Sequence, residues 1–99
     1  MVTYHGIFTC KTGQREKYVQ EIIESHLVEA FRRQEGCLFY EASTSVLEPD
    51  DLIVSDAWET EEDYKAHCDS QEVKDWHEIY HRYVIKADAR EYHFENKTE

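Results

Sequence analysis

The chain has 99 residues, of which 40% are hydrophobic and 13% aromatic, and its formal net charge at pH 7 is −11. The ring content is too high for a disordered chain, and the length suits one domain that spans residues 1–99 around a single core. Nucleic acids and anionic membrane surfaces need a basic footprint on the protein, so the charge argues against both as partners.

The first third of the chain predicts a strand followed by a helix. Val2 to Cys10 alternates with period two, as in a half-buried strand. Three residues then share one side of this strand: Tyr4, Gly6 and Phe8. From Gln14 to about Arg33 the apolar residues recur at helical spacing, which predicts one continuous helix. His26 lies on the apolar stripe of this helix, so we expect it to be partly buried.

The middle of the chain predicts a β-hairpin. Cys37 to Val46 alternates again after the helix breaks at Gly36, and Leu52 to Glu59 follows as a further strand. The residues between these strands, Glu48 to Asp51, include Pro49 and are typical of a turn that links adjacent strands. The two segments should therefore pair with each other in an antiparallel manner.

Two short helices are predicted next. Thr60, with Asp63 three residues later, is typical of a helix start, so we expect a helix from Glu61 to about Cys68. Ser70 is a second candidate N-cap, because apolar residues with helical spacing follow it as far as Tyr83.

The complete order of elements defines a fold class. Lys86 to Phe94 predicts a final strand and residues 95–99 a frayed end, which gives the order β-α-β-β-α-α-β. This is the α+β, ferredoxin-like split βαβ pattern with its second helix in two pieces. It predicts a four-stranded antiparallel sheet with helices on one face.

The other face of the predicted sheet keeps several apolar side chains. Its residues are His5, Ile7, Cys37, Phe39, Ile53 and Ala57. A large apolar surface in water is a typical interaction site, so we expect a second copy of the chain to pack there, sheet to sheet. The sequence therefore predicts a homodimer.

The cysteines and the N-terminal stretch indicate a compartment. Cys10, Cys37 and Cys68 are far apart, odd in number and lack a C-x-x-C pair, which favours free thiols in a reducing environment. The N-terminal stretch has no charged n-region and no long apolar run, so we expect no signal peptide and no membrane span. These features predict a cytoplasmic protein.

Residues 77–81 read H-E-I-Y-H, the spacing with which two histidines on one helical face hold zinc while a glutamate activates water. The sequence offers no third ligand. In the longer metzincin pattern, Val84 stands at the glycine position and Ala87 at the third histidine, and the later glutamates lie in a strand and the chain end. We therefore expect no metal site here, and we expect Glu78 and His81 at the surface.

Four short motifs carry a resemblance: Gly13 at a turn, Glu35–Glu41, Trp58–Glu62 and Ala66–His67. Together they resemble the antibiotic biosynthesis monooxygenase family over nearly the whole chain, although Glu35 stands where that family often has proline. The resemblance implies a pair of ferredoxin-like copies that form a dimeric α+β barrel. Members of the family include oxygenases of polyketide or quinol-type aromatics, haem-degrading monooxygenases and enzymes that process quorum-sensing signals, so the fold alone does not define the reaction.

The haem-degrading branch of this family can be compared residue by residue. Its asparagine on the first strand, tryptophan on the short helix and histidine on the next helix fall on Gly6, His67 and His77. Only the histidine is retained, so haem degradation is disfavoured, while haem binding through His77 is an alternative.

The resemblance favours a cofactor-independent monooxygenase that acts on a small aromatic or quinol-type substrate, with no metal or flavin. Such an enzyme deprotonates the substrate so that the anion can pass an electron to dioxygen, which needs a base and a dry pocket. His67 and His77 are the candidate catalytic bases, because an unperturbed histidine titrates near neutral pH. The candidate substrate-binding residues are Tyr40, Trp58, Tyr64, Trp76 and Tyr80. For Tyr40 and Trp58, a place in the core is the favoured explanation, because aromatic residues pack well on a sheet in any case.

A function from another class keeps the same fold and cleft. The protein could be a binding or stress-associated dimer, or an isomerase-like enzyme that acts on a small carbonyl signal molecule. Oxygen consumption with a quinol or anthrone distinguishes the oxygenase from both. A cleft filled by its own tyrosine and tryptophan side chains would favour the binding protein.

Overall fold

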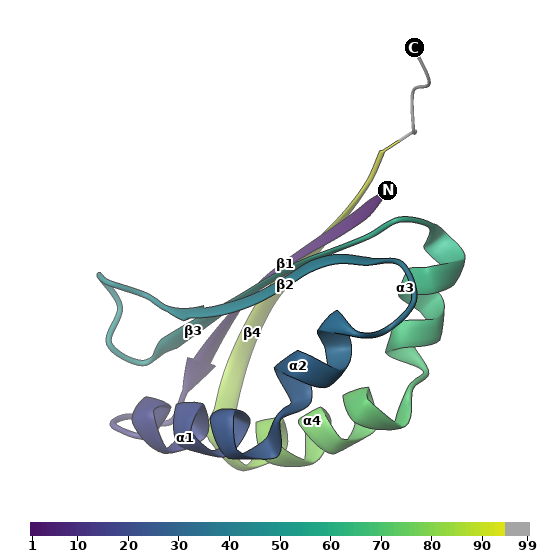
Figure 1. Ribbon diagram of the computed structural model, residues 1–99. Coiled ribbons are helices and arrows are strands. Elements are labelled where there is room, and N and C mark those ends of the chain that lie inside the picture. Colours follow the sequence, from purple (N-terminus) through teal and green to yellow (C-terminus); the bar gives the residue numbers. More distant parts are fainter. Residues whose placement is uncertain (95–99) are drawn as a thin grey trace.

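The computed structural model describes residues 1–94, and within that range the chain forms four strands and four helices. The elements are β1 (Val2–Cys10), α1 (Arg15–Ser25), α2 (Leu27–Arg32), β2 (Cys37–Thr44), β3 (Asp51–Trp58), α3 (Glu61–Cys68), α4 (Gln71–Tyr83) and β4 (Val84–His93). The sheet is antiparallel with the order β2-β3-β1-β4, and the helices lie on one of its faces (Figure 1). The α+β, ferredoxin-like fold is therefore confirmed. The frayed end predicted for residues 95–99 lies outside the described range.

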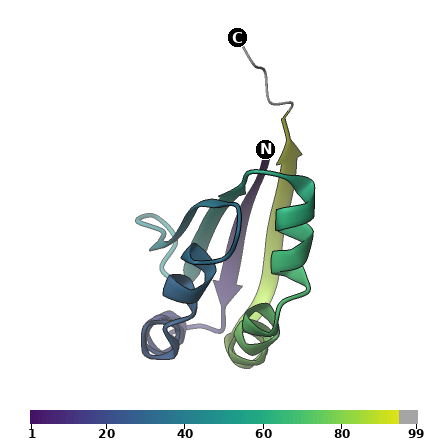
Figure 2. The ribbon, with the colours of Figure 1, turned by 45° about the vertical axis from the view of Figure 1, so that its right-hand side comes forward.

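The core lies between the sheet and the helices. Alternate residues of β3 point toward the helices, and Leu52, Val54 and Trp58 among them are at most 2% exposed. Tyr18 of α1 and Phe31 of α2 pack against this face of the sheet. In Figure 2, α1 and α2 lie over one half of the sheet and α3 and α4 over the other half, on the same face. The two helical pairs therefore cover the same face of the sheet.

The helix predicted from Gln14 to Arg33 is wrong in one respect, because the chain breaks it at His26. His26 adopts a left-handed conformation with φ 58° and ψ 21°. The Ser25 hydroxyl donates to the Ile22 carbonyl at 2.7 Å and accepts from the Leu27 amide at 3.2 Å, which satisfies backbone groups at the break. The His26 side chain is 79% exposed, so its predicted partial burial is also wrong.

The two predicted helix starts are confirmed. The Thr60 hydroxyl accepts a hydrogen bond from the Asp63 amide at 3.1 Å, and the Ser70 hydroxyl accepts one from the Val73 amide at 3.3 Å. These caps fix where α3 and α4 begin, and thereby which of their side chains face the sheet. None of the helices in residues 1–94 is long and apolar enough to cross a membrane.

Gly36 and Gly13 offer a matched pair of substitutions. Both have positive φ, 78° and 74°, but a Cβ at Gly36 would lie 2.1 Å from the Asp63 carboxyl group, whereas a Cβ at Gly13 meets nothing within 4 Å. We expect Gly13→Ala to cost about 1 kcal/mol of unfolding free energy through backbone strain. Gly36→Ala should cost about 1–2 kcal/mol more, because α3 must also shift. Urea denaturation measures both, and equal losses would contradict the close approach of α3.

Candidate active site

The helix-covered face of the sheet carries a row of polar residues. Strand pairing sets Asp56 of β3 directly beside Tyr4 of β1 and beside Tyr40 of β2, and it sets Tyr4 beside Glu91 of β4. Residues paired in register share a face of the sheet and lie about 5 Å apart. The row therefore places one carboxyl group between two phenol rings, beneath the helices.

The neighbouring row is built from small residues. Gly6 pairs with Ala89, and Phe8 pairs with Ala87 two residues further along β1. A Cβ on Gly6 would come within 2.7 Å of the Phe8 ring and 3.0 Å of the Tyr4 ring, so only glycine allows both rings to lean over this position. The small side chains leave a hollow between the sheet and the helices.

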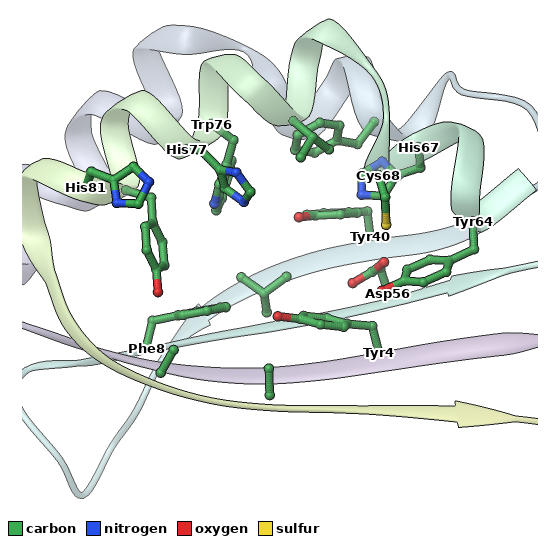
Figure 3. A pocket seen from close by; sticks show the side chains of 16 residues that line it. Tyr4, Phe8, Tyr40, Asp56, Tyr64, His67, Cys68, Trp76, His77 and His81 are labelled. Carbon is green, nitrogen blue, oxygen red and sulfur yellow. The ribbon is translucent and has the colours of Figure 1, made fainter.

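This hollow is a cavity of about 460 Å³ between the sheet, α3 and α4 (Figure 3). Its volume lies in the range that holds small-molecule ligands. The tyrosine and tryptophan side chains of the protein do not fill the cavity. A filled cleft would have favoured the binding protein over the oxygenase, and the structure does not show one. Its lining residues are Tyr4, Phe8, Phe31, Tyr40, Val54, Asp56, Tyr64, His67, Cys68, Val73, Trp76, His77, Tyr80, His81, Ala87 and Ala89.

His67 lies in the last turn of α3 and is 8% exposed. Its Nδ1 is 2.6 Å from Gln34 Oε1, and since an amide oxygen only accepts, this nitrogen carries the proton and Nε2 keeps the lone pair. Its ring stacks on Trp58 at 4.3 Å and meets Phe31 edge-on at 4.9 Å. Burial lowers the pKa of His67 to about 4, so the imidazole is neutral at pH 7.

Asp56 is the buried charge of the site, at 2% exposure. Trp58 Nε1 donates to its Oδ2 at 2.6 Å, and within residues 1–94 no hydrogen bond is made to its Oδ1. Burial raises the pKa of Asp56 to about 6; the Trp58 hydrogen bond opposes this rise and the Glu91 charge adds to it. The carboxyl group is thus mostly ionised at pH 7, yet more basic than an exposed aspartate.

Three tyrosines surround Asp56. Burial, followed by the Asp56 charge, raises the pKa of Tyr4 to about 12 and holds that of Tyr40 well above 10. Both remain neutral hydroxyls at pH 7, and both point into the cavity in Figure 3. Tyr64 of α3 donates its hydroxyl hydrogen to Glu91 Oε1 at 2.7 Å, which ties that helix to β4.

The other end of the cavity is formed by α4. His77 and His81 are exposed there, with ring centroids 6.1 Å apart, and Tyr80 meets Phe8 edge-on at 5.5 Å. Burial, and then the proximity of His81, lower the pKa of His77. Nowhere in residues 1–94 do three or more His, Cys, Asp or Glu side chains gather in a way that could hold a metal ion.

The structure brings six of the seven predicted site residues to the cavity: His67, His77, Tyr40, Tyr64, Trp76 and Tyr80. The seventh, Trp58, was predicted to contact the substrate, but it is fully buried behind His67 and does not line the cavity. His81 is exposed as predicted, yet it also lines the cavity.

The sequence interpretation missed Asp56. A signal was present, because Asp56 has the same phase in its strand as Leu52, Val54 and Trp58 and is therefore directed inward. An aspartate at a core-facing position of an apolar strand is rare unless its charge has a partner or a task.

The fold and this cavity define an α+β protein with a ligand-sized site between one sheet and its helices. The sequence pattern of the antibiotic biosynthesis monooxygenase family matches residues 1–79. The chain therefore belongs to that family, and the resemblance expected from Trp58–Glu62 and its neighbouring motifs is confirmed. No curated protein matches the chain in sequence.

Solved structures share the fold at low sequence identity. Protein SO0527 from Shewanella oneidensis is 21% identical, with a TM-score of 0.84 over 94% of this chain and 89% of that one. A candidate antibiotic biosynthesis monooxygenase from Deinococcus radiodurans is 19% identical, with a TM-score of 0.84 over 100% and 97%. Rv0793 from Mycobacterium tuberculosis is 11% identical, with a TM-score of 0.80 over 99% and 98%.

His67 and Asp56 should respond to pH with opposite signs. The pKa of His67 is lowered from 6.5 to about 4, so its contribution to stability is present above pH 6.5 and is lost as the pH falls toward 4. The pKa of Asp56 is raised from 3.8 to about 6, so its contribution is present below pH 3.8 and is lost as the pH rises through 6. Each is worth about 2–3 kcal/mol, and between pH 4 and 6 the two nearly cancel.

We therefore expect two single variants to differ from the parent in how their unfolding free energy depends on pH. Relative to the parent, Asp56→Asn should lose about 2–3 kcal/mol of unfolding free energy between pH 7 and 4, and His67→Gln should gain a similar amount. Urea denaturation at several pH values measures this, with the double variant as a control that should run parallel to the parent. Parallel curves for the single variants would contradict the buried environments of both groups.

Proposed function

We propose that the protein is a cofactor-independent oxygenase of a small hydroxyaromatic or quinol-type substrate, bound in the cavity beneath α3 and α4. The observation that carries this proposal is the combination of an open cavity of about 460 Å³, aromatic walls and buried groups that can accept a proton. Trp76 and Tyr40 both line the cavity, where their rings can contact a planar ligand. Family membership supports the same reaction class.

The reaction needs only a base and dioxygen. A base removes a proton from the substrate, and the electron pair stays on the aromatic system as an anion. This anion gives one electron to dioxygen, and the two radicals combine into a carbon–oxygen bond as a peroxide. The protonated base returns the proton, and a second proton loss at the same carbon breaks the O–O bond and releases water. One oxygen atom remains in the quinone product, and the low polarity of the cavity limits leakage of the reactive species.

The two predicted histidines have different places in this scheme. His67 is neutral at pH 7 and presents the lone pair of Nε2, so it suits a hydrogen bond from a substrate hydroxyl other than the one that ionises. His77, at the exposed end of the cavity, can exchange protons with water. We propose that His67 orients the substrate and that His77 carries protons in and out.

Oxygen uptake with an anthrone or a quinol tests the proposal. We expect the parent protein to consume dioxygen, and His67→Ala and His77→Ala to lower kcat/KM by about 10²-fold, as is typical of lost acid–base groups. His26→Asn is the matched control, because this histidine is exposed at the helix break and should leave the rate unchanged. Absence of uptake across a broad panel of phenols would favour the non-oxygenase functions.

We also propose that the protein works as a homodimer through the face of the sheet that the helices leave uncovered. Ile7 and Ile53 pair with each other on that face, and Phe39 of β2 is 45% exposed. The prediction that Cys37 lies on this face is wrong, because the register shifts between Cys37 and Phe39 and Cys37 packs against the core. Apolar side chains in such a row favour packing of sheet on sheet. A two-fold axis would let one face bind its own copy.

A charge on this face should separate the proposed dimer. We expect Ile53→Glu to shift the mass measured by analytical ultracentrifugation from two chains to one, because the two buried carboxylates would face each other. Ile23→Glu is the matched control, since Ile23 is 59% exposed on α1, among the helices. A parent protein that sediments as a single chain would contradict the dimer.

A further inference from the structure

We propose that Asp56 is a further catalytic residue, whose Oδ1 takes the proton of the substrate hydroxyl, and that the cavity consequently selects uncharged hydroxyaromatics over aromatic carboxylates. This inference rests on the proposed oxygenase function and specifies its proton acceptor and substrate class. It is carried by a carboxyl group that is almost fully buried, oriented by one hydrogen bond, and open to the cavity at its other oxygen.

The carboxyl group is held in a fixed orientation. Trp58 Nε1 donates to Oδ2 at 2.6 Å, and the Trp58 ring is fully buried against His67, so the indole has little freedom. Oδ1 has no hydrogen bond within residues 1–94. In that range, Tyr18 Oη is the only side-chain oxygen or nitrogen that is both fully buried and without a hydrogen bond. Asp56 Oδ1 has no hydrogen bond either, so it is not fully buried, and Asp56 lines the cavity. A ligand in the cavity can therefore reach Oδ1. A substrate hydroxyl can therefore donate a hydrogen bond to Oδ1, the carboxylate oxygen that Trp58 does not contact.

The groups that face Asp56 come from every element around it. Tyr4 and Glu91 lie on β1 and β4, and the side chains on β2 are Tyr40 and Cys37. Those on α3 are Tyr64, His67 and Cys68. α4 adds Tyr80, His77 and His81 to the same cavity, with the two histidines at the end away from Asp56 (Figure 3). Within residues 1–94 no cation forms a hydrogen bond or an ion pair with Asp56, and His67 is neutral at pH 7. The charge of Asp56 is uncompensated, so a bound carboxylate would meet repulsion in a poorly solvated site.

The two neighbouring phenols complete the chemistry. When the substrate O–H bond breaks, its proton binds to Asp56 Oδ1 and the electron pair remains on the substrate oxygen. Tyr4 and Tyr40 flank Asp56 and keep their hydroxyl hydrogens at neutral pH, so they can donate to the new oxyanion. Dioxygen then oxidises this anion, and the Asp56 carboxylic acid returns its proton to the peroxide before water leaves.

Binding of a matched ligand pair tests the inference without any need for turnover. The ligands are 1-naphthol and 1-naphthoate, which share a ring system and differ in charge at neutral pH, and their binding is measured by calorimetry or by the fluorescence of Trp58 and Trp76. The parent should bind naphthol at least tenfold more tightly than naphthoate at pH 7.5. Naphthol affinity should fall as the pH is lowered through about 6, because Asp56 is then protonated.

Two variants and a control show whether Asp56 and the cavity cause the difference in binding between the two ligands. Asp56→Asn keeps an acceptor for Trp58 Nε1, and we expect it to remove the pH dependence, weaken naphthol and strengthen naphthoate by about tenfold each. Asp75→Asn, an exposed acid on α4, should behave like the parent. Ala89→Leu fills the cavity floor and should abolish binding of both ligands, which locates them in the cavity. Equal naphthol and naphthoate binding that Asp56→Asn leaves unchanged would overturn the inference.

Oxygen uptake separates this inference from the proposed function. If the parent consumes dioxygen, Asp56→Asn should lower kcat/KM by about 10²-fold and remove the acid limb of its pH profile. Uptake that survives unchanged in Asp56→Asn would overturn the inference and leave the oxygenase standing. Selective naphthol binding without uptake would support Asp56 as the hydroxyl acceptor and refute the oxygenase.

Discussion

The hydrogen bond from Trp58 to Asp56 is the interaction on which the site depends. A buried carboxylate costs several kcal/mol of lost hydration, while one hydrogen bond to a charged group returns about 1.5–3 kcal/mol. The deficit appears as the raised pKa of Asp56. The same indole ring stacks on His67, whose Nδ1 is held by Gln34. One fully buried side chain therefore orients both the acidic and the basic group of the cavity.

The register of the strands places Asp56 where the Trp58 indole can donate a hydrogen bond to it. Asp56 faces the helices only because β3 pairs with β1 and β2 in the observed register, and a slip by one residue would turn it to the opposite face. The same register sets Gly6 and Ala89 side by side, which provides empty volume beside the polar row. The polar groups and the space for a ligand thus have a common origin in strand pairing.

The fold followed from the sequence because it is encoded by long periodic segments and local caps. Period-two and period-3.6 patterns identified every strand and the general place of every helix, and Thr60 and Ser70 marked two helix starts. The break at His26 was missed because it depends on side-chain hydrogen bonds of Ser25, which apolar periodicity does not register. Asp56 was missed because the site was sought among aromatic and histidine residues, and the burial of a charge is a tertiary effect.

The helix break at His26 has a consequence for how this protein can diverge. Because α2 runs in a different direction from α1, Phe31 and Gln34 reach His67, and Gln34 determines which imidazole nitrogen is free (Figure 1). His26 itself is exposed and does not line the cavity. Substitutions here that disfavour the left-handed conformation of residue 26 can therefore retune the basicity of the interior by small changes in helix direction. Asparagine adopts this conformation readily and should preserve the direction of α2. Relatives with identical cavity walls can differ in chemistry for this reason.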